Sequence, residues 1–90
     1  MHLHEGHRQR LRSRLRAEGC DSFEDHQLLE ALLFYAVQRC DTNETAHRLI
    51  ERFGSLGAVF TASADELMLV EGVGQNSADL IRLVSGIRCR

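Results

Sequence analysis

The sequence predicts an all-α domain of five or six short helices. Apolar residues recur three or four positions apart in successive windows, as on the buried face of a helix, and no window shows a convincing strand. Capping residues and glycines separate these windows, and because proline is absent every turn depends on Gly, Asn, Asp and Ser. The 90 residues, 43 % of them hydrophobic, suffice for one small core and leave no room for a second domain.

The first helix is expected over residues 7–18, after a frayed segment 1–5 and before Gly19, which ends it. Arginines at the even positions of 8–16 would also fit a β-strand, but the other face of that strand would mix Gln, Ser and Leu, a poor sheet core. A helix instead gathers three residues, spaced four apart, on one narrow stripe: His7, Leu11 and Leu15.

The second helix is expected to be the centre of the domain. Asp21 or Ser22 can cap it, with Glu24 or Asp25 as the capping-box partner three residues on. The apolar face that follows, over residues 28–37, is too wide for a helix at the surface. Neighbouring helices should therefore cover it on most sides.

The remaining helices are divided by caps and glycines. Asp41 begins the cap of a third helix, whose apolar residues match helical spacing until Gly54 ends it. Ser55 can start a single short turn, and residues 63–66 form a capping box that opens a helix of about six residues. The last helix should run over residues 75–87.

The charged residues exclude several kinds of chemistry. All 11 cations are arginines, so lysine Schiff bases, lysine nucleophiles and a phosphate-loop lysine are impossible. The net charge of −2 argues against binding of nucleic acid through a global positive field. It conceals an asymmetry: residues 1–20 hold five Arg and two acids, which is +3, and residues 21–90 hold six Arg and eleven acids, which is −5.

The sequence predicts a cytoplasmic protein without a cofactor. No apolar run approaches the roughly 18 residues that span a membrane, so no membrane contact is expected. The three cysteines are too widely spaced for a disulfide framework or a zinc ribbon and are expected to be reduced: Cys20, Cys40 and Cys89. Histidines at the frayed start could hold a transition metal, but we expect them to bind none: His2, His4 and His7.

No catalytic residue is predicted. His26 and His47 lie on helix faces beside acids or arginines, where solvated or capping roles are commoner than catalysis. No spacing supports a Ser–His–Asp or Cys–His arrangement. The paired acids of the chain are better explained as first-turn residues that complement helix dipoles.

The most informative segment is 67–81, which reads as a short helix, a Gly-x-Gly turn and a second helix. The two glycines permit a positive φ or a close approach of the backbone to another molecule, while the aliphatic residue between them anchors the turn. Backbone N–H groups at this turn and at the start of the next helix should converge on one point and hold an anion. The residues expected to do so are Gly72, Val73, Gly74, Gln75, Asn76 and Ser77.

This segment, about residues 63–87, resembles the helix-hairpin-helix motif, whose known families grip the phosphate backbone of DNA without reading sequence. Gln75 and Asn76 stand where many such hairpins carry Lys or Arg, which leaves open that the hairpin only packs two helices. The upstream connector is similar to that of tandem helix-hairpin-helix domains, such as the one at the end of the UvrC nuclease subunit. The corresponding first hairpin, residues 38–43, lacks glycine and is expected to be degenerate.

Several blocks in order resemble the N-terminal domain of the bacterial RadC family. They are GHRQRLR (6–12), FEDHQLLE (23–30), LLFYA (32–36), DTN (41–43) and RFGSL (52–56). The resemblance implies a single helical domain over 6–90, a DNA-repair association and, in the family, a following C-terminal JAB/MPN-type domain with a zinc-dependent hydrolase signature. That signature is absent from these 90 residues, so neither that domain nor a catalytic site is expected in this chain. The family usually has Pro where Gln38 and Glu44 stand.

The arginines of the first helix are a second candidate contact surface. Three of them fall within about 80° of one another on a helix: Arg8, Arg12 and Arg16. This stripe could straddle a phosphate backbone, pair with the acids of residues 21–30, or dock the C-terminal domain of the family.

Two functions therefore follow from the sequence. The first is a non-catalytic module that binds DNA without sequence preference, favoured by the Gly-x-Gly turn. The second is a protein-interaction or self-association module, with a homodimer or the hydrolase domain of the family as partner. The missing cations after Gly74 favour this second reading.

Overall fold

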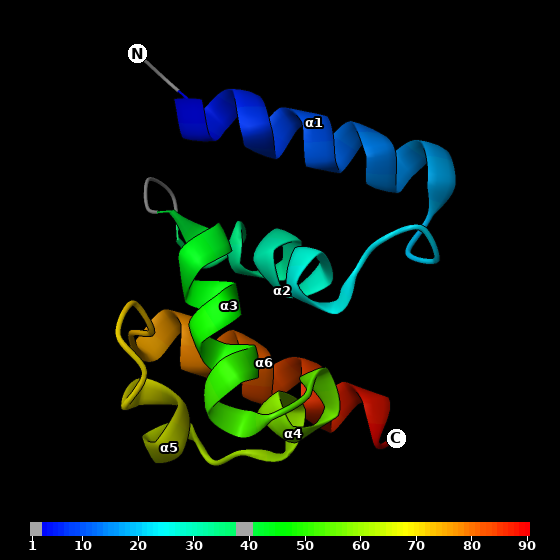
Figure 1. The fold of residues 1–90 in the computed structure, drawn as a ribbon. Helices are drawn as coiled ribbons and strands as arrows, with labels where there is room; N and C mark the ends of the chain where they lie inside the picture. The colour runs from blue at the N-terminus through cyan, green and yellow to red at the C-terminus, as the bar shows by residue number, and fades with distance from the viewer. Residues whose placement is uncertain (1–2, 38–40) are drawn as a thin grey trace.

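The computed structural model describes residues 3–37 and 41–90, and in this part of the chain it contains six α-helices and no strand (Figure 1). The predicted all-α class is therefore confirmed. The helices are α1 (Leu3–Glu18), α2 (Asp25–Leu33), α3 (Thr42–Phe53), α4 (Leu56–Thr61), α5 (Ala64–Met68) and α6 (Gln75–Arg88).

Most of the predicted helix ends agree with the structure. The Asp41 side chain caps α3 by accepting hydrogen bonds from the amides of Asn43 and Glu44, at 3.1 and 3.4 Å. Gly54 ends that helix with a φ of +95°, in the left-handed region that glycine adopts without strain. The capping box at the start of α5 and the start of α6 also lie where the sequence places them.

Two helix starts differ from expectation. Helix α1 begins at Leu3, so residues 3–5 belong to it although they were expected to be frayed. Gly6 lies inside the helix, where one glycine costs only about 1 kcal/mol. The predicted caps Asp21 and Ser22 are wrong, because the N-cap of α2 is Glu24, whose amide donates to the Gln27 side chain at 3.0 Å.

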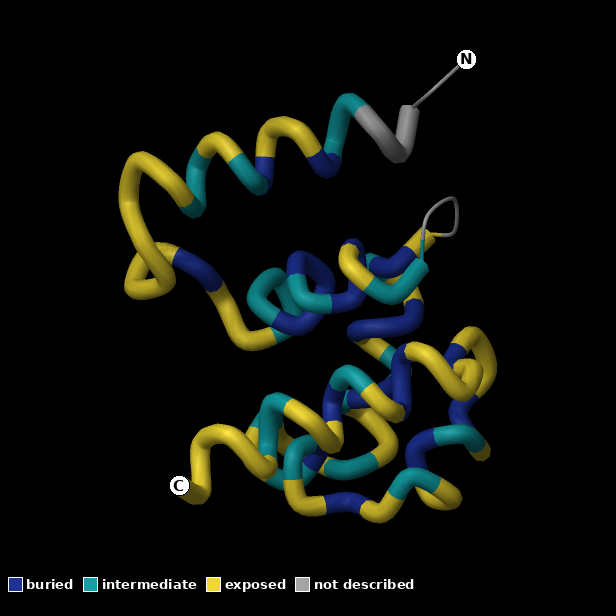
Figure 2. Tube along the Cα trace, turned by 180° about the vertical axis from the view of Figure 1, so that it is seen from behind, coloured by how far each residue is buried: buried dark blue, intermediate teal, exposed yellow. Residues whose placement is uncertain are grey.

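The larger hydrophobic core lies among α2 to α6, and Figure 2 shows buried stretches on the sides that these helices turn toward one another. Helix α2 contributes to it as the central helix that the sequence predicts, but α2 ends at Leu33, so Tyr35 of the expected apolar face lies beyond the helix and is 69 % exposed. The buried members are Leu29, Leu33, Ala46, Leu49, Val59, Ala62, Leu67, Val70, Val73, Ala78 and Ile81.

Helix α1 lies across α2 at one end of the molecule, and α4, α5 and α6 form the other end (Figure 1). A second, smaller cluster joins α1 to α2. It consists of Leu11, Phe23, Ala31 and Phe34, with Leu15 and Leu28 packed against it. The predicted stripe of α1 is therefore confirmed as its packing face.

A buried carboxylate links three helices where sequence reasoning found nothing. Glu30 of α2 is only 2 % exposed, and its Oε2 lies 2.7 Å from Nε2 of His7 in α1. The side-chain amide of Asn43, in α3, donates to the other carboxylate oxygen at 3.2 Å. The carboxylate thus meets hydrogen-bonding partners on two neighbouring helices, as a buried acid requires.

Three further expectations concern the surface and the chain ends. Within residues 3–37 and 41–90 no helix is both long and apolar enough to cross a membrane. Cys20 and Cys89 are exposed free thiols, whereas Cys40 lies outside the described residues. The expected degenerate hairpin falls partly on residues 38–40, and His2 on residues 1–2, which are likewise not described.

Candidate phosphate-binding hairpin

Helices α5 and α6 pack as the two arms of a hairpin, with the turn between them at residues 69–74. The side chains that the sequence assigns to the contact between the arms are all buried in the larger core: Leu67, Val70, Ala78 and Ile81. Val73 is also buried there, so it anchors the turn from inside. The short helix, tight turn and second helix predicted for this segment are therefore present.

The two glycines of the turn have different roles. Gly72 has a φ of +95°, and a Cβ at this position would overlap Oγ1 of Thr45, which is buried in α3. Gly74 has an ordinary φ of −99°, and nothing lies within 4 Å of where its Cβ would be. Gly72 therefore serves the packing of the turn on α3, whereas Gly74 leaves open space at the start of α6.

The predicted set of free amides is narrower in the structure. The Val73 N–H does not point outward, because it donates to the Val70 carbonyl at 3.1 Å and closes the turn. Ser77 is only 1 % exposed, so its amide is shielded from a large ligand. Gly72, Gly74, Gln75 and Asn76 are exposed residues, so their amides remain the candidates for contact with a ligand.

This helix start has no side-chain cap. Its N-cap residue is Gly74, which has no side chain, and the Gln75 amide group instead donates to Asp79 at 2.8 Å. The first amides of an α-helix have no acceptor within the helix, and the helix dipole gives that end a partial positive charge. An anion can therefore supply the missing acceptors.

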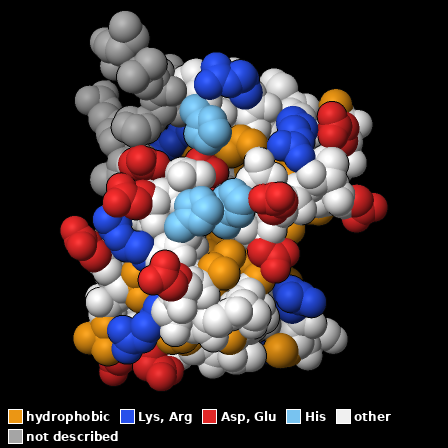
Figure 3. Space-filling view, in the orientation of Figure 1, with side chains coloured by type: hydrophobic (Ala, Val, Ile, Leu, Met, Phe, Trp, Pro, Cys, Tyr) orange, Lys and Arg blue, Asp and Glu red, His pale blue; other side chains and the backbone are white. Residues whose placement is uncertain are grey.

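The charges around the hairpin are mixed. Glu71 and Asp79 are exposed acids near the turn, and Arg48 of α3 reaches it from the side. Nη1 of Arg48 lies 3.5 Å from the Glu71 carbonyl oxygen, and Nη2 lies 2.7 Å from a carboxylate oxygen of Glu44. Figure 3 shows carboxylates and arginines interspersed on the face it presents. Sequence reasoning missed Arg48 because the contact spans 23 residues.

The predicted arginine stripe divides between packing and solvent. Arg8 is only 7 % exposed, and its guanidinium carbon lies 4.8 Å from the centroid of the Phe34 ring. Arg12 lies over Phe34 and Tyr35, at 5.7 and 5.3 Å, whereas Arg16 is exposed. Two of the three arginines thus hold α1 on α2 through cation–π contacts. The stripe and the hairpin are not brought together, because α1 and α5–α6 lie at opposite ends (Figure 1).

The two helix histidines stack on each other. The rings of His26 in α2 and His47 in α3 lie 4.2 Å apart, and Nδ1 of His26 is 3.5 Å from a carboxylate oxygen of Glu24. Helical periodicity indicates that each ring is near the surface, but the stack depends on how α2 crosses α3. In the part of the chain that the structure describes, no three His, Cys, Asp or Glu side chains gather as a metal site.

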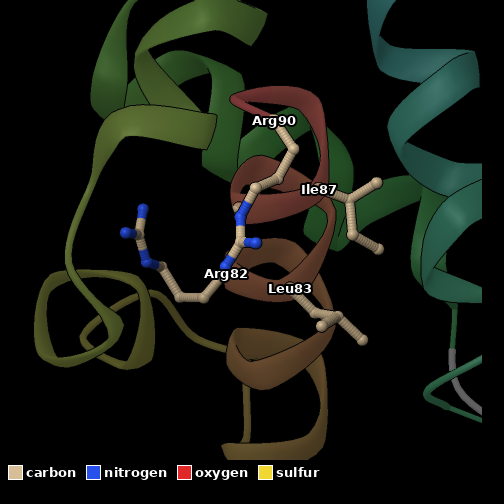
Figure 4. Close-up of a pocket in the computed structure, with 5 residues that line it drawn as sticks. Arg82, Leu83, Ile87 and Arg90 are labelled. Carbon is tan, nitrogen blue, oxygen red and sulfur yellow. The ribbon is translucent and has the colours of Figure 1, made fainter.

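The last helix carries an apolar depression of about 460 Å³ that opens to solvent, lined by Arg82, Leu83, Gly86, Ile87 and Arg90 (Figure 4). Leu83 and Ile87 are 61 % and 63 % exposed and lie one helical turn apart. Arg82 turns away from them and donates to the carbonyls of Phe60 and Ala62, at 3.2 and 3.0 Å. The exposed part of the depression is therefore mainly apolar.

Comparisons with known proteins identify the family. Residues 4–78 match the model of the family described as UPF0758 N-terminal. The UPF0758 protein FN0909 of Fusobacterium nucleatum is 40 % identical over 80 residues, which make up 89 % of this chain and 34 % of that relative. The chain thus spans about a third of the length of this curated relative, and no solved structure matches it. The chain belongs to the UPF0758 family, whose N-terminal region is that of the RadC family.

Proposed function

We propose that this domain is a non-catalytic module that binds the phosphate backbone of DNA, without reading sequence, at the start of α6. The observation that supports this most is the uncapped helix start at Gly74, where exposed amides meet open space. A phosphate oxygen can accept from these amides, and the absence of a Cβ lets the DNA backbone approach closely.

Binding through this site is weak. The accessible amides contact one phosphate or two, the acids Glu71 and Asp79 oppose the DNA, and Arg8 and Arg12 are occupied in packing α1 on α2. One or two phosphate contacts correspond to a salt slope of about −1 to −2, and non-specific dissociation constants commonly lie near 10⁻⁴ to 10⁻⁶ M. The domain suits a role in which an attached region supplies further affinity.

A fluorescence-anisotropy titration with duplex and branched DNA tests the proposal. Raising the salt concentration from about 50 to 200 mM should weaken binding about 4- to 12-fold. Gly74→Ala should weaken it several-fold at low salt, because the added methyl group occupies the open approach. Gly86→Ala is the control, since it adds a methyl group inside α6, away from the helix start, where likewise nothing lies within 4 Å. Absence of binding at low salt overturns the proposal.

A second candidate function is docking of a neighbouring domain on α6, favoured by the exposed side chains of Leu83 and Ile87. The family model describes an N-terminal region, and the curated relative is about three times as long as the matched segment. Two apolar side chains fall far short of the roughly 800 Å² per partner of a stable interface between free proteins. They suit a tethered occupant, whose high effective concentration tolerates a small contact. The occupant we propose is the hydrolase-like domain that follows in the family.

Hydrogen exchange tests whether the following domain of the family, rather than a second copy of the chain, occupies this surface. The experiment compares the 90-residue chain with a chimera in which it replaces the matching region of the Fusobacterium protein. Docking predicts slower exchange of the α6 amides in the chimera, reversed by the double variant Leu83→Ser and Ile87→Ser. Leu69→Ser is the control, because Leu69 is as exposed but lies outside the depression. If the α6 amides exchange equally fast in the chain and in the chimera, docking is contradicted. If the 90-residue chain forms a dimer and the double variant is a monomer, the occupant of this surface is a second copy of the chain.

A further inference from the structure

We propose that Arg48 is the cation of the hairpin site and that Glu44 holds it when no DNA is bound. This inference rests on the proposed function and adds to it a charged phosphate ligand that comes from α3. Bound phosphate would take the guanidinium from Glu44, so the two residues act as a local exchange pair. The phosphodiester of DNA is the ligand they select.

The packing of α3 on the hairpin places Arg48 at the turn. Gly72 lies directly against Thr45, and Arg48 follows Thr45 by three residues, which puts both side chains on the same face of α3. Nη1 of Arg48 lies 3.5 Å from the carbonyl oxygen of Glu71, the residue before Gly72. The guanidinium is therefore held beside the turn by the fold itself.

The ion pair of Arg48 is of the kind that exchanges readily. The Arg48 and Glu44 side chains are 37 % and 61 % exposed, and their contact of 2.7 Å joins residues four apart on one helix. Such solvated pairs are weak, because water screens the attraction and two long side chains lose freedom. A guanidinium carries five N–H donors and suits the oxygen pairs of a phosphate, so it can leave Glu44 for DNA.

Arg48 provides the cation that the turn of the hairpin and the start of α6 lack. Gln75 and Asn76 follow Gly74, so the segment itself offers amides but no cation to a phosphate. Arg48 supplies a positive charge from a different helix, at a position that spacing along the hairpin cannot reveal. Glu44 offsets that charge in the free domain, consistent with weak binding.

Charge-neutralising variants on α3 test the inference with matched controls. Arg48→Gln should weaken duplex binding about 3- to 10-fold at low salt and reduce the salt slope by about 1. Arg52→Gln removes the same charge one turn further along α3 and should change affinity less than twofold. Glu44→Gln should tighten binding two- to fivefold, whereas Glu51→Gln, two turns away, should have a smaller effect. Arg48→Lys keeps the charge but loses the paired N–H donors of the guanidinium, so its affinity for DNA should lie between those of the wild type and Arg48→Gln.

The outcomes separate this inference from the function on which it rests. If the wild-type chain binds DNA and Arg48→Gln binds equally well, the inference is overturned and the hairpin proposal stands. If Arg48→Gln and Arg52→Gln weaken binding alike, the effect is one of general charge and the inference also fails. If the wild type shows no binding at low salt, both are overturned. Circular dichroism of each variant verifies that the helices remain folded.

Discussion

At the scale of single residues, the hairpin depends on Gly72 for its shape. A side chain here would meet two obstacles, the left-handed backbone with its φ of +95° and the Thr45 hydroxyl of α3. Gly72→Ala should therefore lower the free energy of unfolding by about 2–3 kcal/mol. Gly74→Ala, with an ordinary φ and no neighbour, should cost less, about 0.5–1 kcal/mol, because Ala is a poorer N-cap than Gly. Thermal unfolding followed by circular dichroism measures both.

A double-variant cycle separates the two obstacles. Thr45→Ala removes the hydroxyl that the new methyl group would overlap, so Gly72→Ala should cost less in that background. The remaining cost reports the strain of the positive φ. Equal costs in both backgrounds would show that the overlap with Thr45 contributes nothing.

The sequence predicts this turn but cannot assign its glycines. The Gly-x-Gly pattern with flanking aliphatic residues indicates a tight turn between two helices, and the structure confirms it. Which glycine packs against a neighbour depends on Thr45, which lies 27 positions earlier in the chain. The same reason hides Arg48, whose contact with Glu71 exists only once α3 is placed on the hairpin.

At the scale of helices, α5 shows how a very short element is held. Five residues are too few for a helix that is stable alone, so α5 depends on its capping hydrogen bonds and on its packing against the core. The Ser63 hydroxyl accepts from the Glu66 amide at 3.1 Å, and the Glu66 carboxylate accepts from the Ser63 amide at 3.0 Å. The hydrogen bond from the Ser63 amide to the Glu66 carboxylate lowers the pKa of Glu66 below its ordinary 4.5, and an interaction of the Ser63 hydroxyl with the same carboxylate adds to this effect.

The lowered pKa of Glu66 predicts a pH dependence of stability. Because the pKa is lower in the folded state, the carboxylate stabilises the fold fully above pH 4.5, and this contribution is lost as the pH falls through the folded pKa. Glu66→Gln should therefore reduce the loss of stability on acidification from about pH 5 to pH 3. Urea unfolding at a series of pH values measures this. An unchanged pH profile in the variant would contradict the role of the carboxylate.

Helix starts differ in how far the sequence predicts them. The cap of α3 is local, because Asp41 accepts from amides two and three residues later, and it is found from the sequence. The start of α2 depends on tertiary structure. Asp21 and Ser22 lie in a turn that the Phe23 amide closes by donating to the Cys20 carbonyl at 3.0 Å. This turn places Phe23 in the cluster between α1 and α2, and the helix starts only after Glu24.

At the scale of the whole molecule, the fold consists of two hydrophobic clusters of unequal size. The larger one holds the five helices from α2 through α6 together, and the smaller one attaches α1 to α2. Sequence periodicity indicates which face of each helix is buried, including the stripe of α1. It cannot show that Arg8 is buried over Phe34, because cation–π contacts depend on where α1 crosses α2. An arginine stripe that looks like a free surface is therefore partly a packing surface.

The unequal clusters predict that α1 opens independently of the remaining helices. Leu49 is wholly buried in the larger cluster, so Leu49→Ala should cost about 3–5 kcal/mol, a large part of the roughly 5–13 kcal/mol expected for a domain of this size. Leu11 lies in the smaller cluster, and Leu11→Ala should cost nearer 2 kcal/mol.

Native-state hydrogen exchange measures which helices each substitution destabilises. Leu11→Ala should speed exchange in α1 while α3 and α6 keep their protection, whereas Leu49→Ala should speed exchange in all the helices that share the larger core. If Leu11→Ala speeds exchange equally throughout the domain, α1 unfolds as one unit with the other helices. The hydrogen bond between His7 and Glu30 would then couple α1 to the larger core more strongly than its small apolar contact suggests.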